Sequence, residues 1–252
     1  MKACCIFVFC LLLFCQSAFA QKNDTLDFYA DIKKQDATEF VLVSNQSIGF
    51  LGNDYQRFYI HFTSVQKSEK NSYQYLIKGK TKVKNNIYIF TGTLTIKTAI
   101  TVRVQDDPEI PQNIRAGKFT ASINLQEDKE QYGSGKITGT LSKGFILMDG
   151  KMADDQLLYY GDMPYEGNYF EGQWTSNKTG KSKPCLWHNG GGWTKPQDLF
   201  RLGDDGDVYI NLHYLKNGWE NYVTAWHSAQ LGVDDENRIR EAQAKEQEKW
   251  WK

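Results

Sequence analysis

The fold is decided by residues 73–98, which read YQYLIKGKTKVKNNIYIFTGTLTIKT. Up to Val83, apolar or small residues alternate with Gln74, Leu76 and a row of lysines, and such alternation is typical of a strand with one buried face. Asn85 and Asn86 tolerate the positive φ angles that a two-residue hairpin turn requires. The stretch therefore predicts an antiparallel β-hairpin.

A turn at Asn85-Asn86 also predicts which residues face each other. Lys84 would pair with Ile87, so the numbers of paired residues would sum to 171 and Gly79 would lie opposite Gly92. One face then collects the apolar residues of both strands, and the other carries the lysines at positions 78, 80, 82 and 84. Because a slip by one residue would mix the two faces, the pattern specifies its own pairing.

A short pattern, apolar-x-Gly-x-apolar, recurs at residues 90–94, 137–141 and 170–174. In each case the glycine falls on the apolar face, where a missing side chain lets a strand coil sharply. Further alternation at 118–126 and apolar runs at 145–148 and 157–160 are separated by turn signals. We therefore expect a mainly β protein, an antiparallel meander forming a curved barrel or a sandwich, with a short C-terminal helix.

Residues 1–20 have the features of a secretory signal peptide. Lys2 precedes an apolar run at 6–14, and Ala18-Phe19-Ala20 is a suitable cleavage site. The run is shorter than a membrane-spanning helix needs, so no stable membrane span is expected after removal of the signal. A lipid anchor on Cys15 is less favoured because the bulky Phe14 precedes it. The prediction is an exported protein that is periplasmic, on the cell surface or secreted.

The remaining chain is expected to form a β-rich domain at residues 21–233, with a possible division into two lobes near 149–162. Residues 234–252 read as a polar C-terminal helix or tail, capped by Asp234 or Asp235 and supported by a Glu236–Arg240 pair. A short helix is expected at 222–229. Of five cysteines only Cys185 follows the signal, so no internal disulfide can form.

Composition excludes one class of partner. The chain holds 30 basic and 30 acidic side chains, and losing Lys2 with the signal leaves it close to neutral. Proteins that bind nucleic acid normally show a clear basic excess or stripe. No nucleic-acid partner is therefore expected.

Motifs for catalysis or metal binding are missing from the sequence. It has no Gly-x-Ser-x-Gly, phosphate-binding loop or His-Glu-x-x-His, and its four histidines share no metal-ligand spacing, so we expect no cofactor, no metal and, on balance, no enzyme. Two weaker alternatives remain open. Glu166 and Glu171 could serve glycoside hydrolysis, and Cys185 could be a nucleophile beside His188, although a lone cysteine here favours a core position.

Aromatic residues give the best functional indication. All seven tryptophans lie in the last third of the chain, and Trp rings can stack on sugars or hold amphipathic ligands. For any one of these rings a core position is the more common outcome. The candidate binding residues are Trp174, Trp187, Trp193, Trp219 and Trp226.

These features favour a noncatalytic extracytoplasmic binding or accessory protein that holds a glycan, a lipid or a protein. One alternative is an exported glycoside hydrolase. Another is a structural or inhibitory module that contacts its partner through a sheet edge or through the C-terminal helix.

Two segments, residues 54–62 (DYQRFYIHF) and the tryptophan at 174 followed by 178–185 (KTGKSKPC), resemble a group of uncharacterised exported β-rich proteins of Gram-negative gut bacteria. The likeness extends over about residues 49–226. It implies a periplasmic, surface or secreted setting, and it brings no catalytic residue with it.

Overall fold

The computed structural model describes residues 25–42, 47–103, 114–149, 151–153, 168–189, 195–204 and 207–252. The expected signal peptide, the apolar run at 157–160 and most of the possible lobe boundary lie outside these residues. No helix in the described ranges is both long and apolar enough to cross a membrane.

Ten strands form one antiparallel sheet, and two more form a small hairpin. The sheet contains β1 (Thr25–Asp27), β2 (Ile48–Leu51), β3 (Gln56–Lys67), β4 (Gln74–Val83), β5 (Asn86–Arg103), β6 (Arg115–Glu127), β7 (Gly135–Met148), β8 (Lys151–Ala153), β9 (Asn168–Ser176) and β10 (Ser182–Asn189). The hairpin pairs β11 (Phe200–Leu202) with β12 (Val208–Ile210).

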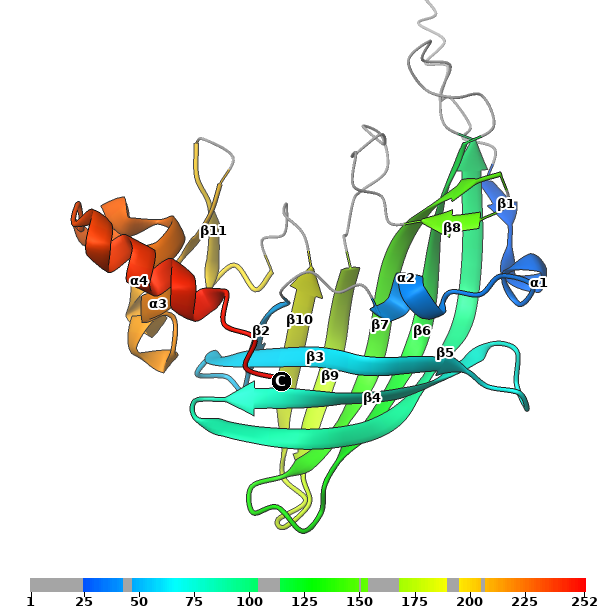
Figure 1. The fold of residues 1–252 in the computed structure, drawn as a ribbon, viewed down its shortest axis with the longest axis horizontal. Coiled ribbons are helices and arrows are strands. Elements are labelled where there is room, and N and C mark those ends of the chain that lie inside the picture. Colours follow the sequence, from blue (N-terminus) through cyan, green and yellow to red (C-terminus); the bar gives the residue numbers. More distant parts are fainter. Residues whose placement is uncertain are drawn as a thin grey trace, which may run out of the picture.

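The sheet closes into a barrel (Figure 1). Following the pairings, β2, β3, β4, β5, β6, β7, β9 and β10 form a ring in chain order, and β10 returns to pair with β2. β1 and β8 extend the wall beside β5 and β7. The mainly β antiparallel meander is thus confirmed, in its barrel form.

Side chains fill the barrel, as expected for eight strands. Its core includes large buried residues from nearly every strand of the ring: Phe58, Tyr75, Phe90, Phe119, Phe145, Phe170 and Trp187. Two short N-terminal helices, α1 (Tyr29–Ile32) and α2 (Thr38–Leu42), add Ile32 and Phe40 to this core. The Phe40 ring packs edge-on against Phe119 and Phe145, with ring centroids 6.1 and 6.3 Å away.

The expected hairpin is β4–β5, but its register differs from the prediction. Val83 pairs with Asn86, so paired numbers sum to 169 rather than 171, and the turn consists of Lys84 and Asn85, with Lys84 at φ 54°. A shift by two leaves every side chain on its expected face. Gly79 now lies opposite Phe90 instead of Gly92. A Cβ on Gly79 would come within 2.4 Å of the Phe90 ring, so the missing side chain makes room for that ring.

The recurrent glycines mark close contacts between strands. Gly139 of β7 pairs with Gly172 of β9, and a Cβ on either would lie 2.6–2.7 Å from the Cα of the other. The Phe170 ring fills the space beside both. Tight approach of the strands here allows the curvature that closure of the wall demands.

A buried carboxylate lies inside the wall near the β6–β7 turn. Glu127 is 2% exposed; its Oε2 accepts hydrogen bonds from the Gly135 amide (2.7 Å) and from Trp174 Nε1 (3.0 Å), and its Oε1 accepts one from the Thr81 hydroxyl. Burial raises the pKa of Glu127, and the three donors lower it by less. The carboxyl joins four strands of the ring at this end.

The C-terminal part forms a second core on the outside of the barrel. It contains β11 and β12, the 3-10 helices η1 (Leu212–Asn217) and η2 (Ser228–Leu231), and the helices α3 (Glu220–Trp226) and α4 (Glu236–Glu246). Phe200, Ile210, Trp219 and Val223 pack against the outward side chains of Phe50 and Leu186 on β2 and β10.

The C-terminal helix predicted within residues 234–252 exists and spans Glu236–Glu246. Asp235 caps it by accepting hydrogen bonds from the amides of Asn237 and Arg238, and Glu236 pairs with Arg240 at 3.3 Å. The helix is docked on α3, where Gln243 donates to the carbonyl of Ala225.

The register predicts different costs for two glycine substitutions. Gly79→Ala should lower the free energy of unfolding by about 2 kcal/mol, because the new methyl meets the His61 carbonyl and the Phe90 ring. Gly144→Ala is the matched control, since a Cβ there has one neighbour, at 3.9 Å. Denaturant unfolding of both variants measures the difference, and equal stability of the two would contradict the register.

The raised pKa of Glu127 predicts a dependence on pH. Because the folded state holds this proton more tightly than the unfolded chain, the contribution of Glu127 is fully present below its ordinary pKa of 4.5 and is lost as pH rises through the folded value. The Glu127→Gln variant resembles the protonated acid. As pH rises from 4.5 through the folded pKa, the free energy of unfolding of the wild-type protein should therefore fall relative to that of this variant. A relative gain would mean that the three hydrogen-bond donors outweigh burial.

Candidate functional site

The structure separates the five tryptophans that the sequence suggested. Trp187 is 4% exposed inside the barrel, stacked on Phe170 at 3.6 Å, and Trp174 reaches Glu127 from the same core. Trp219 is fully buried in the second core, whereas Trp226 on α3 is 44% exposed. Trp193 lies outside the described residues. The four described rings therefore share no common groove, and their role in binding remains a prediction.

The structure bears on the two catalytic alternatives, the cysteine nucleophile and the carboxylate pair, to different extents. Cys185 and His188 lie on one strand at an odd spacing, so Cys185 points into the barrel and His188 points to the outer side. Burial raises the pKa of the Cys185 thiol well above its ordinary value, which disfavours a thiolate. Glu171 is exposed on the outer wall, where Tyr169 donates a hydrogen bond to it at 3.1 Å. Glu166 lies outside the described residues, so the carboxylate pair remains untested.

A buried ion pair fixes the C-terminal helix to the barrel. Arg57 on the outer side of β3 is 3% exposed, and its Nη2 donates to Glu246 Oε2 at 3.2 Å. The guanidinium carbon lies 4.4 Å from the centroid of the Trp219 ring, 4.7 Å from that of Tyr59 and 5.1 Å from that of Tyr222. Within the described residues Arg57 Nε and Nη1 have no hydrogen-bond acceptor, so aromatic faces surround much of the cation.

Beside this ion pair, the end of the chain packs against β3. We call this group the aromatic cluster; it comprises Tyr59 and His61 of β3 and Trp250 and Trp251 of the chain end. Trp251 stacks on His61 with centroids 3.9 Å apart, and Trp250 contacts Tyr59 and Trp251 edge-on. All four side chains are partly exposed. Partial burial lowers the pKa of His61, which favours a neutral imidazole against the Trp251 ring.

The neighbouring strands carry a second group of side chains, which we call the lysine face. It comprises Leu76, Lys78, Lys80, Lys82, Ile87 and Ile89 on the outside of β4 and β5. Lys82 connects the two groups, because its Nζ lies 5.7 Å from the centroid of Tyr59 and 5.9 Å from that of Trp250. β3, β4 and β5 contain no Asp or Glu.

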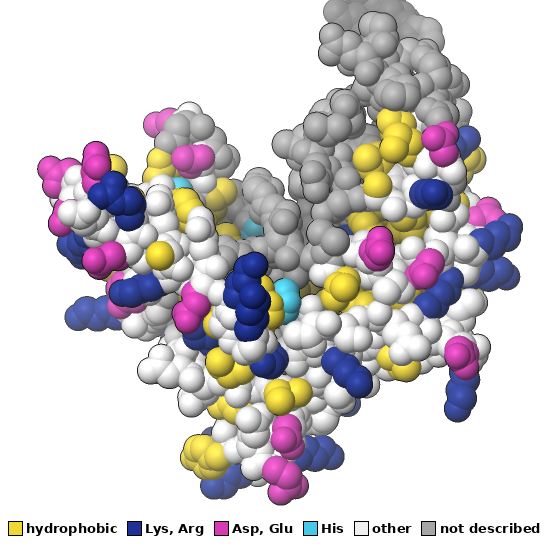
Figure 2. All heavy atoms as spheres, viewed as in Figure 1, with side chains coloured by type: hydrophobic (Ala, Val, Ile, Leu, Met, Phe, Trp, Pro, Cys, Tyr) yellow, Lys and Arg dark blue, Asp and Glu magenta, His cyan; other side chains and the backbone are white. Residues whose placement is uncertain are grey.

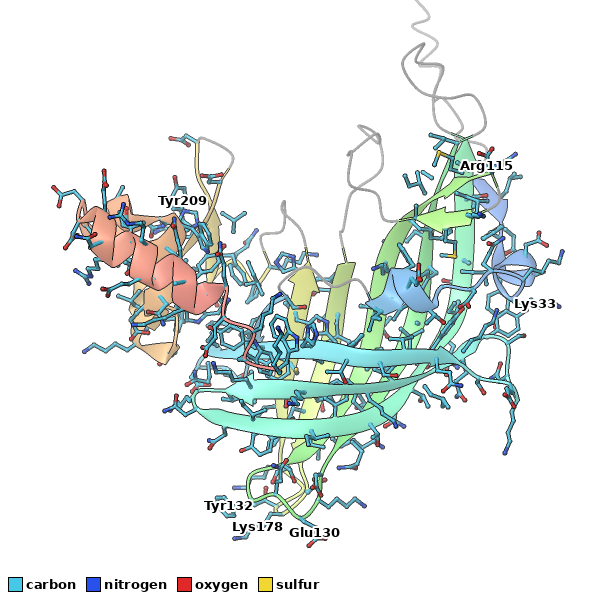
Figure 3. The ribbon with its side chains drawn as sticks, viewed as in Figure 1. Lys33, Arg115, Glu130, Tyr132, Lys178 and Tyr209 are labelled. Atoms are coloured by element: carbon cyan, nitrogen blue, oxygen red, sulfur yellow. The ribbon has the colours of Figure 1, made fainter. Side chains whose placement is uncertain are left out.

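Space-filling and stick views place this surface in the molecule. Figure 2 shows scattered basic and hydrophobic side chains over the front of the barrel, where β3, β4 and β5 cross the view, with acidic side chains beside and above this area and at the lower tip. At the lower tip, Lys178 lies 5.1 Å from the centroid of the strongly exposed Tyr132, with Glu130 close by (Figure 3). The tip therefore carries mixed charge, unlike the lysine face.

The chemistry of this surface is that of recognition. Amines and half-exposed aromatic rings can hold an anion and an apolar group side by side. Among the described residues no three His, Cys, Asp or Glu side chains gather where they could hold a metal ion. The aromatic cluster and the lysine face are therefore the candidate site.

The sequence pattern contained only part of this site. The lysine row was visible as the outer face of a strand, and the alternation in residues 54–62 places Tyr59 and His61 opposite Phe58, Ile60 and Phe62. No local signal links Tyr59 to Trp250 or Arg57 to Glu246. These contacts join residues that lie far apart in the chain.

No family model, no curated protein and no solved structure matches this chain. The assignment of function therefore rests on the geometry of the chain itself.

The buried ion pair predicts unequal effects of two substitutions on α4. Glu246→Ala should cost about 3 kcal/mol of unfolding free energy, because Arg57 would stay buried without its carboxylate. Glu236→Ala removes an exposed carboxylate paired with Arg240 and should cost less than about 1 kcal/mol. Thermal or urea unfolding distinguishes them, and a cost at Glu246 no larger than at Glu236 would remove the ion pair as the anchor of the helix.

Proposed function

We propose that this chain is an exported, noncatalytic binding protein that captures an anionic ligand on the aromatic cluster and the lysine face. The observation that carries the proposal is the run of Lys78, Lys80 and Lys82 on the outside of β4, a strand that, like its neighbours β3 and β5, holds no acidic residue. The signal-like residues 1–20 support export.

The packed interior of the barrel favours a binding surface on its outside. Residues from all eight strands of the ring form one packed interior core, whose largest side chains are almost fully buried. A ligand in the barrel would have to displace these side chains, whereas a ligand on the outer wall displaces water alone. The packed barrel then serves as a rigid support for the exposed groups.

The chain as a whole is close to neutral, so an anion can be attracted only where positive charges are grouped together, as they are on β4. Lysines at alternate positions along β4 lie about 7 Å apart, since a strand rises about 3.4 Å per residue. At physiological ionic strength a charge is screened over about 8 Å, so neighbouring amines act together on a close anion. Acidic groups elsewhere in the chain contribute less at that range.

A lysine substitution tests the proposal. The triple variant of Lys78, Lys80 and Lys82 to Gln should bind the soluble polyanion heparin about tenfold more weakly than the wild-type protein, as judged by titration at low salt. The matched control replaces Lys136, Lys178 and Lys181, which are exposed and lie on β7 and in the turn between β9 and β10. Unchanged affinity in the first variant, or an equal loss in the control, would contradict a site on the lysine face.

A further inference from the structure

We infer that the anionic ligand of this site is the surface of a lipid bilayer, an inference that rests on the proposed function. On this account the barrel lies on the membrane with the outer wall of β4 and β5 and does not cross it there. Three features of the surface favour a bilayer over a soluble polyanion.

The first feature is the exposed aliphatic side chains among the lysines. Leu76, Ile87 and Ile89 are 47%, 39% and 56% exposed. Ile87 pairs with Lys82, and Ile89 pairs with Lys80, so amines and apolar groups lie side by side. A soluble polyanion offers no apolar partner for isoleucine, whereas a bilayer presents anionic headgroups directly above acyl chains.

The second feature is the adjoining aromatic cluster. Tyr59, Trp250 and Trp251 are partly exposed, and Lys82 lies against two of these rings. Tryptophan and tyrosine favour the boundary between headgroups and hydrocarbon, since each ring combines an apolar body with a polar group. The aromatic rings thus extend the amphiphilic surface from β5 across β4 to β3.

The third feature is the distribution of charge around the surface. The nearest acidic residues on the neighbouring turn are Asp128 and Glu130, which follow β6; the amide of Asp128 bonds the Ile89 carbonyl, and the Asp128 carboxylate accepts the amide of Glu130. They lie at one margin, beside Lys129. Toward β3 and the chain end, the carboxylate of Glu246 is buried and paired with Arg57, and the exposed Glu248 is followed by Lys249. The lysines of β4 therefore set the charge of this side, which would face an anionic membrane.

Vesicle co-sedimentation, run beside heparin titration, tests the inference. The full mature chain should sediment with vesicles of phosphatidylcholine containing phosphatidylglycerol, and not with phosphatidylcholine alone. Each lysine removed from the face should reduce partition about fivefold, and added salt should reverse binding.

The aliphatic side chains are tested separately from the charges. The double variant Ile87→Ser and Ile89→Ser should partition about tenfold more weakly into the anionic vesicles while its heparin affinity stays the same. Leu26→Ser with Leu212→Ser is the control, because these side chains are 46% and 41% exposed elsewhere. Unchanged circular dichroism and melting temperature would show that both double variants remain folded.

The outcomes separate the two proposals. Binding to heparin without binding to anionic vesicles would overturn the bilayer inference and leave the proposed anion site standing. Binding to neither would overturn both. Vesicle binding that the two isoleucine substitutions leave unchanged would also overturn the inference, since the amphiphilic character of the surface is its basis.

Discussion

The pairing of β10 with β2 is the contact on which the rest of the structure depends. Four residue pairs, from Cys185 with Leu51 to His188 with Ile48, turn an open meander into a closed ring. Once the ring is closed, each side chain of these strands faces either the barrel interior or its outer surface. Cys185 and Trp187 thereby enter the barrel core, while Phe50 and Leu186 face outward and support the C-terminal core. One short pairing thus holds both cores in place.

A filled barrel directs function to its outer surface. Glu127 joins strands at one end, and Phe40 of α2 packs into the core from the N-terminal segment. Different strands of the outer wall are covered by different parts of the chain. β2 and β10 lie under the C-terminal core, and the ion pair of Arg57 with Glu246 brings the end of the chain to β3. On β4 and β5, Lys78, Ile87 and Ile89 are exposed, and Lys80 and Lys82 are partly exposed.

The sequence allowed much of the wall to be predicted, because inward and outward positions alternate with the pleat. The faces of the β4–β5 hairpin and the inward glycines followed from that alternation alone. The register did not, since the choice between Gly92 and Phe90 as partner of Gly79 depends on where a ring fits in the closed core. Local rules cannot contain that information.

The candidate site was predictable only where it is local. The lysine row has a period of two and could be recognised, but its meaning changed once the structure placed it beside Trp250 and Trp251. The concentration of tryptophans suggested ligand binding but could not tell which rings are buried, because neither Trp187 in the barrel nor Trp219 in the second core has a distinctive local pattern. Pairing between β3 and the chain end depends on tertiary packing of segments some 190 residues apart, as in the contact of Arg57 with Glu246.

The most direct test of the central claim is a lysine acetylation footprint of the folded protein with and without anionic vesicles. Lys78, Lys80 and Lys82 should become protected when vesicles are present, while Lys178 and Lys181 at the lower tip should react at the same rate in both samples. Protection of the tip lysines, with the three lysines of β4 still reactive, would contradict this claim.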